Sequence, residues 1–322
     1  MIGAAPAKGV RPRGTRRWSV AKAVAAILLV VAIVLAAAVY WLFYDNELPT
    51  AGAFVLDVPR LRAAAPGTGP TRIEVEEVSH TFVPKIGVVA GTSWRKFDMM
   101  RTSYRLVWPD RSIVIDSGNS LALARKFGAA TYDVGAWRRI QRALLSASDV
   151  VVTHEHADHI GGIMESPHLA AVLPRMRLTP EQADVGNRAD PLDWPAGAMR
   201  GYRSLRYHDL HALAPGVVLI RSPGHTPGSQ MIYVRRADGR ELLFMGDVAS
   251  AADNVRLQSI RPRYTTEFYG TTHDDRRAVM LETIALHRLH ESDPEITLVP
   301  GHDAIAIRQL EAQELLSLGF RL

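Results

Sequence analysis

The sequence contains no cysteine. This absence excludes disulfide bonds and thiolate metal ligands, and it is compatible with an oxidising compartment without requiring one. The sequence also has no internal repeat at a fixed short period and no low-complexity tract, which argues against a repeat architecture. Any bound metal ion must therefore be held by nitrogen and oxygen ligands, above all imidazole and carboxylate groups.

Acidic residues are absent from the first 22 residues, which carry six basic side chains. The whole chain has 38 Lys and Arg against 33 Asp and Glu, so the remainder has 32 basic residues against 33 acidic ones. The basic balance therefore belongs to the N-terminal segment and not to the rest of the chain. We expect no nucleic-acid partner, because such a partner requires a basic surface on the folded part.

Residues 23–44 carry no charge and are rich in Ala, Val, Ile and Leu. As a helix this stretch would be about 33 Å long, enough to cross a hydrocarbon core of about 30 Å. A basic flank precedes it and the aromatic-rich residues 40–44 close it. We therefore predict a single transmembrane helix in the inner or plasma membrane, with a cytoplasmic N-terminus and an extracytoplasmic, periplasmic domain. The alternative is a signal peptide cleaved at Ala36-Ala37-Ala38, although the apolar run is long for a signal core.

Four segments follow from these features. They are a basic cytoplasmic segment at 1–22, a transmembrane helix at 23–44, a linker at 45–70 and a folded domain at 71–322. The linker holds four prolines together with Ala and Gly, which is typical of a spacer, and its residues 55–61 include apolar side chains able to pack on the domain. The domain is long enough for one well-buried core.

Apolar patterns within 71–322 predict alternating strands and helices. The predicted strands are 72–78, 103–108, 112–115, 148–153, 217–221, 241–245 and 295–299, and the predicted amphipathic helices are 134–145 and 274–289. Residues 80–100 contain glycines, aromatic residues and methionines without strong periodicity. We expect them to form a long apolar loop that covers a site or packs over the fold.

The run 153–162 places His154, His156, Asp158 and His159 within six positions. Imidazole and carboxylate groups are the ligands of divalent zinc or iron, and burying them unpaired would cost kilocalories each. Because the run follows the predicted strand 148–153, His154 and His156 point the same way on an extended chain and can share one metal. Asp158 and His159 follow where the chain turns, so we predict that they face a second metal.

Three residues farther along complete an ordered pattern. His225 lies in Ser-Pro-Gly-His-Thr-Pro-Gly, Asp247 in Met-Gly-Asp and His302 in Pro-Gly-His-Asp, and each follows a predicted strand. Each residue alone would be interpreted as an ordinary capping or core residue. Together with the run His-x-His-x-Asp-His, the ordered set favours a metal site, and it resembles the signature of the metallo-β-lactamase superfamily.

The resemblance implies an α/β (α+β) fold, a four-layer αββα sandwich with the ligands along one edge of two paired sheets. It implies two Zn²⁺ ions per chain, with iron or manganese as alternatives. The first metal would be held by His154, His156 and His225, the second by Asp158, His159 and His302, and Asp247 would bridge them. In this family an Asp at the place of Asp116 lies beneath the metal loop, but a turn-forming Asp before Gly118 is an equal interpretation.

The chemistry expected of such a pair is hydrolysis. Two divalent ions about 3.5 to 4 Å apart lower the pKa of a shared water towards about 7, so that hydroxide attacks the substrate. Asp158 is the candidate catalytic residue that accepts the proton. Glu155 points away from its neighbours and is not expected to be a ligand. Relatives that reduce oxygen with iron place a Glu where this chain has His156, which argues against an iron redox enzyme.

The substrate class rests on weaker features. Residues 214–230 look like the corresponding stretch of acyl-homoserine lactone lactonases, whereas Gly224-His225-Thr226 also occurs in hydroxyacylglutathione hydrolases. Those lactonases carry a Tyr soon after the bridging Asp, whereas this chain has Val248-Ala249-Ser250 there. Tyr264 or Tyr269 would have to substitute for that Tyr. We expect a small-molecule lactone or carboxylic ester as substrate. The alternatives are a thioesterase, a β-lactamase-type amidase, or a membrane-tethered protein that binds metal without catalysis. The expected partners are that substrate and the lipid bilayer.

Overall fold

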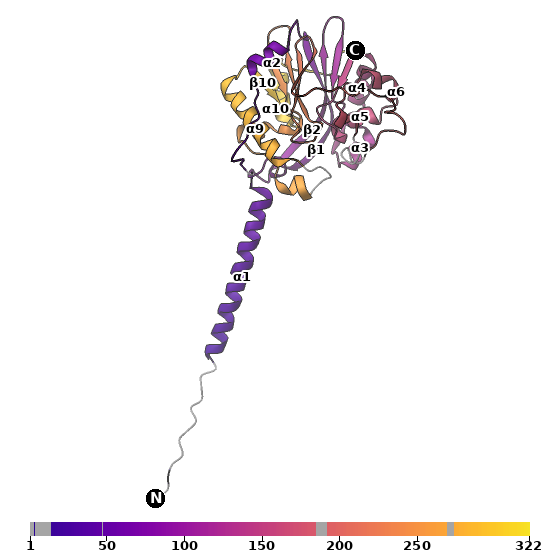
Figure 1. The fold of residues 1–322 in the computed structure, drawn as a ribbon. Helices are drawn as coiled ribbons and strands as arrows, with labels where there is room; N and C mark the ends of the chain where they lie inside the picture. Colours follow the sequence, from indigo (N-terminus) through magenta and orange to yellow (C-terminus); the bar gives the residue numbers. More distant parts are fainter. Residues whose placement is uncertain (1–2, 4–13, 47, 185–191, 269–273) are drawn as a thin grey trace.

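The computed structural model describes residues 3, 14–46, 48–184, 192–268 and 274–322. Two β-sheets lie face to face within the part of the chain after the N-terminal helix (Figure 1). The first sheet has the strand order β11-β1-β2-β3-β5, with β4 paired to β1. Its strands are β1 (Arg72–Pro84), β2 (Lys96–Val107), β3 (Ser112–Ile115), β4 (Thr131–Tyr132), β5 (Asp149–Val151) and β11 (Ser317–Leu318).

The second sheet has the order β10-β9-β8-β7-β6. Its strands are β6 (Leu210–Ala214), β7 (Val217–Arg221), β8 (Gln230–Arg235), β9 (Glu241–Phe244) and β10 (Ile296–Val299). Strands β3 and β5 of the first sheet pair in parallel, and so do β9 and β10 of the second sheet. Each of these parallel pairs lies next to antiparallel strands. These parallel pairs carry the chain to one common edge, where the loops after β5, β9 and β10 begin.

The core lies between the two sheets and continues beneath the helices on their outer faces. Val217 and Leu219 of β7 face the first sheet, whereas Val218 and Ile220 face the helices behind the second sheet. This alternation follows from the two-residue period of a strand, and it makes both faces apolar because both are covered. All four side chains are almost fully buried.

Helices cover the outer face of each sheet, which completes four layers. In Figure 1, α4, α5 and α6 lie on one side of the strands and α9 on the other. The helices of the domain are α3 (Leu121–Lys126), α4 (Val134–Ser146), α5 (Ala157–Met164), α6 (Leu169–Val172), α7 (Pro180–Ala183), α8 (Ala252–Arg256), α9 (Arg276–Ser292) and α10 (Ala304–Ala312). Short turns of other helix types are η1 (Lys85–Gly87), η2 (Leu173–Arg175), η3 (Gly246–Ala249) and η4 (Tyr264–Phe268).

The αββα sandwich predicted from the sequence is confirmed by these layers. One expectation about it is only partly right: residues 80–100 are not a loop along their whole length. Strand β1 continues to Pro84 and β2 begins at Lys96, and the two strands pair as far as these residues, so that the irregular part is the connection 85–95, which contains η1. The strand pattern was hidden because a bulge between Glu77 and Ser79 interrupts the alternation.

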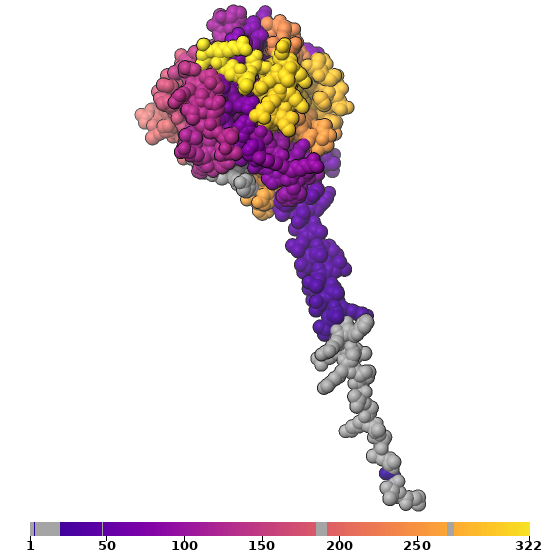
Figure 2. All heavy atoms as spheres, turned by 180° about the vertical axis from the view of Figure 1, so that it is seen from behind, coloured from indigo at the N-terminus to yellow at the C-terminus, as the bar shows by residue number. Residues whose placement is uncertain are grey.

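An N-terminal helix, α1 (Gly14–Phe43), projects from the domain (Figures 1 and 2). Its part from Val20 to Phe43 is long and apolar enough to cross a membrane, and nearly all side chains there are exposed. The helix agrees in position with the predicted span at 23–44. A signal sequence would meet the same criterion of length and composition, so membrane crossing stays a prediction.

The predicted linker at 45–70 is not a free spacer along its length. Its residues 58–64 form α2 (Val58–Ala64), which Asp57 caps by accepting a hydrogen bond from the main chain of Arg60. Val58 and Leu61 are buried against the second sheet. Burying each of these side chains contributes about 1.5 to 3 kcal/mol, which ties this segment to the domain.

Candidate metal centre

The loop after β5 supplies the first side chains of the site. His154 and His156 lie on the segment between β5 and α5, and His156 is the N-cap of α5. Asp158 and His159 lie in the first turn of that helix. The strand-to-helix transition therefore produces the change of direction that the sequence predicted between the two pairs.

The remaining candidates come from three other loops at the same edge. His225 lies in the loop between β7 and β8, Asp247 in η3 directly after β9, and His302 in the turn between β10 and α10. All three side chains are buried. The fold thus brings together all seven residues that the sequence selected, in three overlapping groups whose ligand atoms lie within 4.8 Å of one another.

His154, His156 and His225 form one group. The distance from His156 Nδ1 is 3.1 Å to His154 Nε2 and 2.9 Å to His225 Nε2. Three ring nitrogens therefore converge on one point. The three rings meet nearly edge to face, with interplanar angles of 79°, 76° and 90°, so their nitrogen lone pairs approach that point from different directions.

Asp158, His159 and His302 form a second group. His159 Nε2 lies 3.2 Å from His302 Nε2, and His302 Nε2 lies 3.6 Å from Asp158 Oδ2. Asp247 lies between the groups: its Oδ1 is 3.0 Å from His302 Nε2, and its Oδ2 is 3.7 Å from His225 Nε2. One carboxylate thus directs an oxygen at each group.

These contacts fit cations and do not form a stable network without them. Burial and the neighbouring histidine rings lower the pKa of both His154 and His156 well below the usual value, so both rings are neutral at pH 7. In a neutral ring one nitrogen carries a hydrogen and the other only a lone pair. The nitrogens that converge here therefore cannot all be satisfied by hydrogen bonds to one another. Asp247 Oδ1 is also buried without a hydrogen bond of good geometry. Divalent metal ions would satisfy these lone pairs.

Residues 98–306 match the family model described as the metallo-beta-lactamase superfamily. The chain belongs to this superfamily. A probable metallo-hydrolase of Mycobacterium tuberculosis is 27% identical over 190 residues, which cover 52% of this chain and 59% of that protein. The chain therefore spans less than two thirds of that relative's length.

Two further likenesses involve lactonases. An N-acyl homoserine lactonase of Rhizobium radiobacter is 24% identical over 222 residues, covering 62% of this chain and 80% of that protein. The solved structure of a quorum-quenching N-acyl homoserine lactone lactonase superposes with a TM-score of 0.58 at 14% identity, covering 76% of this chain and 96% of that one. The structural likeness shows the fold, in agreement with the family match of this metallo-beta-lactamase superfamily protein.

In this superfamily member, buried groups orient two of the histidine rings by contacting their Nδ1 atoms. Asp116 accepts hydrogen bonds from the main chain and hydroxyl of Thr153, at 2.7 and 2.9 Å, and contacts His159 Nδ1 at 2.9 Å. His302 Nδ1 donates to the carbonyl of Met100 at 2.8 Å. Such partners fix the ring orientation and leave the other nitrogen free for a metal. Asp116 therefore lies beneath the metal loop, and its φ of 56° also makes it the turn residue that the alternative interpretation expected.

Glycines before the loop residues are required by close packing. A Cβ atom on Gly301 would lie 2.5 Å from Asp247 Oδ1 and 2.8 Å from the carbonyl of Gly246. Gly246 itself has a φ of +54°, and a Cβ there would lie 3.0 Å from Thr153. The Gly-Asp and Gly-His contexts in the sequence therefore allow two loops to approach each other at Asp247.

Two arginines next to the site were not found from the sequence. Arg101 on β2 donates through Nε to Asp158 Oδ2 at 3.2 Å. Arg261 donates through Nη2 to Asp274 Oδ1 at 2.7 Å, contacts His225 Nδ1 with the same nitrogen, and places Nη1 3.8 Å from Asp247 Oδ2. Neither arginine belongs to a motif, because tertiary approach alone brings them here.

Glu155 connects two loops, in agreement with the expectation that it is not a ligand. Its carboxylate accepts hydrogen bonds from Thr226 Oγ1 at 2.8 Å and from the main chain of Gly228 at 3.1 Å. It therefore fixes the loop that carries His225 against the loop that carries His154.

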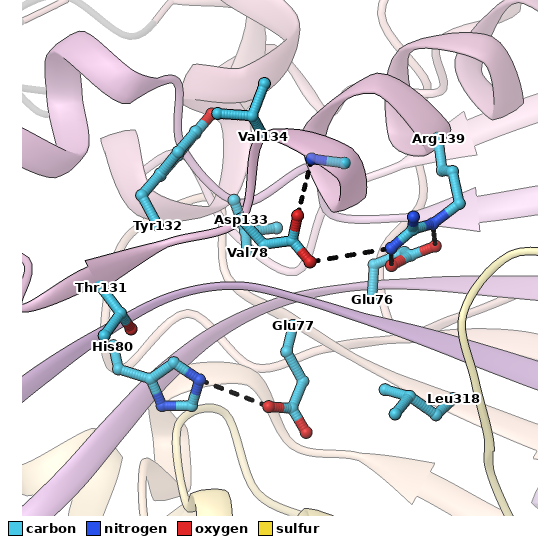
Figure 3. A pocket seen from close by; sticks show the side chains of 11 residues that line it. Glu76, Glu77, Val78, His80, Thr131, Tyr132, Asp133, Val134, Arg139 and Leu318 are labelled. Atoms are coloured by element: carbon cyan, nitrogen blue, oxygen red, sulfur yellow. Dashed lines mark hydrogen bonds and ion pairs between the residues drawn. The ribbon is translucent and has the colours of Figure 1, made fainter.

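Tyr264 and Tyr269 were named from the sequence as possible substitutes for the lactonase Tyr. Tyr264 stacks on Phe43 of α1, and Tyr269 lies outside the described residues. His80 borders a separate cavity of about 530 Å³ beside β1, which shares no residue with the metal centre (Figure 3). Figure 3 shows the His80 ring directed at Glu77.

Proposed function

We propose that the protein is a membrane-anchored dinuclear zinc hydrolase that acts on a small lactone or carboxylic ester. The observation that carries this proposal is the position of Asp247, whose two oxygens are directed at two separate groups of ligand atoms. In this proposal His154, His156 and His225 hold one ion, Asp158, His159 and His302 hold the other, and Asp247 is shared.

The two ions, when bound, supply a water of lowered pKa and polarise the scissile carbonyl group. The protein's own side chains would orient the reactants. Asp158 is the proposed proton acceptor, because it is the most exposed of the seven ligand candidates, with 19% of its side chain exposed. Arg101 holds Asp158 Oδ2 through Nε, which fixes the carboxylate and favours its charged form.

The two arginines also make the site suitable for stabilising negative charge. Arg261 is buried beside Asp247 and Asp274, and its guanidinium cannot lose its proton at neutral pH. Ester and lactone cleavage develops negative charge on the carbonyl oxygen and releases a carboxylate. Preorganised donors and cations at that position lower the barrier.

The substrate class is supported by the likeness to an N-acyl homoserine lactonase. The second candidate is a thioesterase, because a hydroxyacylglutathione hydrolase of Xylella fastidiosa is 28% identical over 145 residues. The test is a panel of a lactone, a carboxylic ester, a thioester, a β-lactam and a phosphodiester, assayed with the zinc-loaded full chain in detergent. We expect the lactone or ester to give the highest kcat/KM.

A highest kcat/KM for the thioester or the β-lactam would reject the lactonase assignment and keep the hydrolase. Absence of turnover of every substrate would favour a protein that binds metal without catalysis.

A further inference from the structure

The last turn of α1 packs against the domain. The carbonyl of Phe43 accepts a hydrogen bond from the main chain of Gly91 at 2.9 Å. The ring of Phe43 lies 5.1 Å from that of Tyr264 and 5.3 Å from that of Trp94. The helix therefore does not merely precede the domain, because its end is fixed to two separate segments of it.

A second contact lies about half a turn back along the helix. The ring of Phe268 meets the ring of Trp41 edge to face at a centroid distance of 6.3 Å, and the guanidinium of Arg263 lies 4.8 Å above the same ring. Trp41 precedes Phe43 by two residues, which is about 3 Å along a helix. The turn η4 thus reaches past the end of α1 and lies beside it (Figure 1).

The rings around the end of α1 stay exposed in spite of these contacts. Trp94 is 61% exposed, Phe268 63% and Tyr264 41%. Together with Trp41 and Phe43 we name these three the membrane-proximal aromatic patch. Large exposed aromatic side chains gathered at one place indicate an interaction surface.

We propose that the membrane-proximal aromatic patch lies in the interfacial zone of the lipid bilayer, so that the domain rests on the membrane and does not stand off from it. This inference rests on the proposed membrane span. The span has 24 residues, Val20–Phe43, and is therefore about 36 Å long, slightly more than the hydrocarbon core. Phe43 then lies at the boundary of the core, and every ring in contact with Trp41 or Phe43 lies at the same depth.

The chemistry of the patch suits this occupant. Tryptophan and tyrosine favour the interface because one part of the ring system is apolar and the other forms hydrogen bonds. Arg95 and Lys96 follow Trp94 and are exposed, and Lys96 covers the ring of Phe82, which is also partly exposed. The hairpin tip thus presents aromatic rings and cations together, as surfaces that bind anionic lipid headgroups do.

The same segment that carries the patch also reaches the metal centre. Arg276 donates through Nη1 to the carbonyl of Arg261 at 2.8 Å and through Nη2 to the carbonyl of Asp45 at 3.0 Å. Arg261 contacts His225, and Tyr264 follows it by three residues. An amphiphilic substrate that partitions into the interface is therefore concentrated on the side of the domain that carries the metal centre.

The absence of cysteine permits a direct test with single introduced thiols. Trp94→Cys, Phe268→Cys, Leu318→Cys and Ile33→Cys are each made in the full chain, labelled with a nitroxide and reconstituted into vesicles of phosphatidylethanolamine and phosphatidylglycerol. Leu318 is 60% exposed and lies four residues before the C-terminus, which Figure 1 places on the side of the domain away from α1, so it is the matched control. Electron paramagnetic resonance then measures collisions with oxygen, which concentrates in lipid, and with a water-soluble nickel complex.

We expect labels at positions 94 and 268 to collide more with oxygen and severalfold less with nickel than the label at 318, and the label at 33 to be the least accessible to nickel. If 94 and 268 are as accessible to nickel as 318 while 33 is shielded, the domain stands off the membrane and the inference is wrong although the anchor is right. If 33 is also accessible to nickel, both the anchor and the inference are wrong.

Discussion

At the scale of single residues, Asp247 would determine whether the two proposed metal ions can be held close together. Its carboxylate lies between the two groups of ligand atoms, and Gly301 and Gly246 leave the space for it. Removing an ordinary ligand affects one ion, whereas removing a shared ligand affects two.

We therefore expect Asp247→Ala to lower the metal content from two ions per chain to less than one, because both positions lose a ligand. Elemental analysis of the purified full chain measures this. Asp238→Ala, in an exposed turn, is the matched control and should keep two ions. One ion or none in the folded, unchelated wild type would contradict the dinuclear assignment.

A second residue-scale prediction concerns His80. A hydrogen bond to Glu77 and the nearby Asp98 raise its pKa above the usual 6.5, while Arg308 contacts the two carboxylates. A raised pKa in the folded state means that the protonated ring stabilises the fold. This contribution is fully present below pH 6.5 and is lost as the pH rises through the folded-state value.

We expect His80→Asn to lower the free energy of unfolding by about 1 kcal/mol at pH 5.5 and by less at pH 9. The loss at pH 5.5 is no larger because the ion pairs of His80 are partly exposed to solvent. Urea denaturation of the detergent-solubilised chain at both pH values measures the difference. An equal loss at both pH values would show that packing, and not charge, accounts for the effect.

The seven ligand candidates could be found from the sequence because each is held by local chain geometry. His154 and His156 share an extended segment, and Asp158 and His159 share the first helical turn. Arg101 and Arg261 could not be found, because their contacts with Asp158 and Asp247 depend on how separate elements approach one another. Asp274, whose Oδ1 lies 3.0 Å from His225 Nδ1, was hidden for a further reason: in sequence it resembles an ordinary residue at a helix start.

At the scale of elements, strands with uniform burial were predicted most accurately. Strand β7 has the predicted bounds, 217–221, since its continuous apolar run is covered on both faces. The stretch 80–100 was misjudged because a bulge and partly exposed residues at the hairpin tip disturb the period. The short helix α2 was not predicted, because a seven-residue helix next to prolines has little periodicity. Its stability comes from packing and not from its own propensity.

Leu61→Ala tests whether α2 is part of the domain. Leu61 is 1% exposed, and truncating a buried leucine costs about 2 to 5 kcal/mol. We expect a loss in this range in urea denaturation followed by tryptophan fluorescence. Leu48→Ala is the control, because Leu48 belongs to the same predicted linker but is 68% exposed. If both variants unfold like the wild type, the segment around α2 is a free spacer in solution.

At the scale of the whole molecule, the charge distribution separates two regions. Basic residues precede the apolar part of α1, a pattern that would favour a cytoplasmic N-terminus if the helix spans a membrane, and the rest of the chain is nearly neutral. The domain is joined to the end of α1 by a hydrogen bond and ring contacts. We therefore expect the domain to lie on the side of the membrane where the C-terminal end of α1 emerges.

We expect a protease added outside intact spheroplasts to digest the domain and to leave the basic N-terminal segment protected. Immunoblots with an antibody against each region measure this. Protection of the entire chain would reverse the orientation. A mature protein that begins near Val39 would instead identify the apolar helix as a cleaved signal peptide.

Arg276 has a consequence for how the molecule bears load. Its guanidinium joins the carbonyl of Asp45, just after α1, to the carbonyl of Arg261, next to the metal centre. When α1 is pulled along its axis, tension enters the domain at Asp45 and passes through this side chain into α9 and the segment 260–268. We expect the edge of the sandwich that holds the histidines to be strained before strand β11, so that the first rupture event in force spectroscopy releases the metal proposed to bind there.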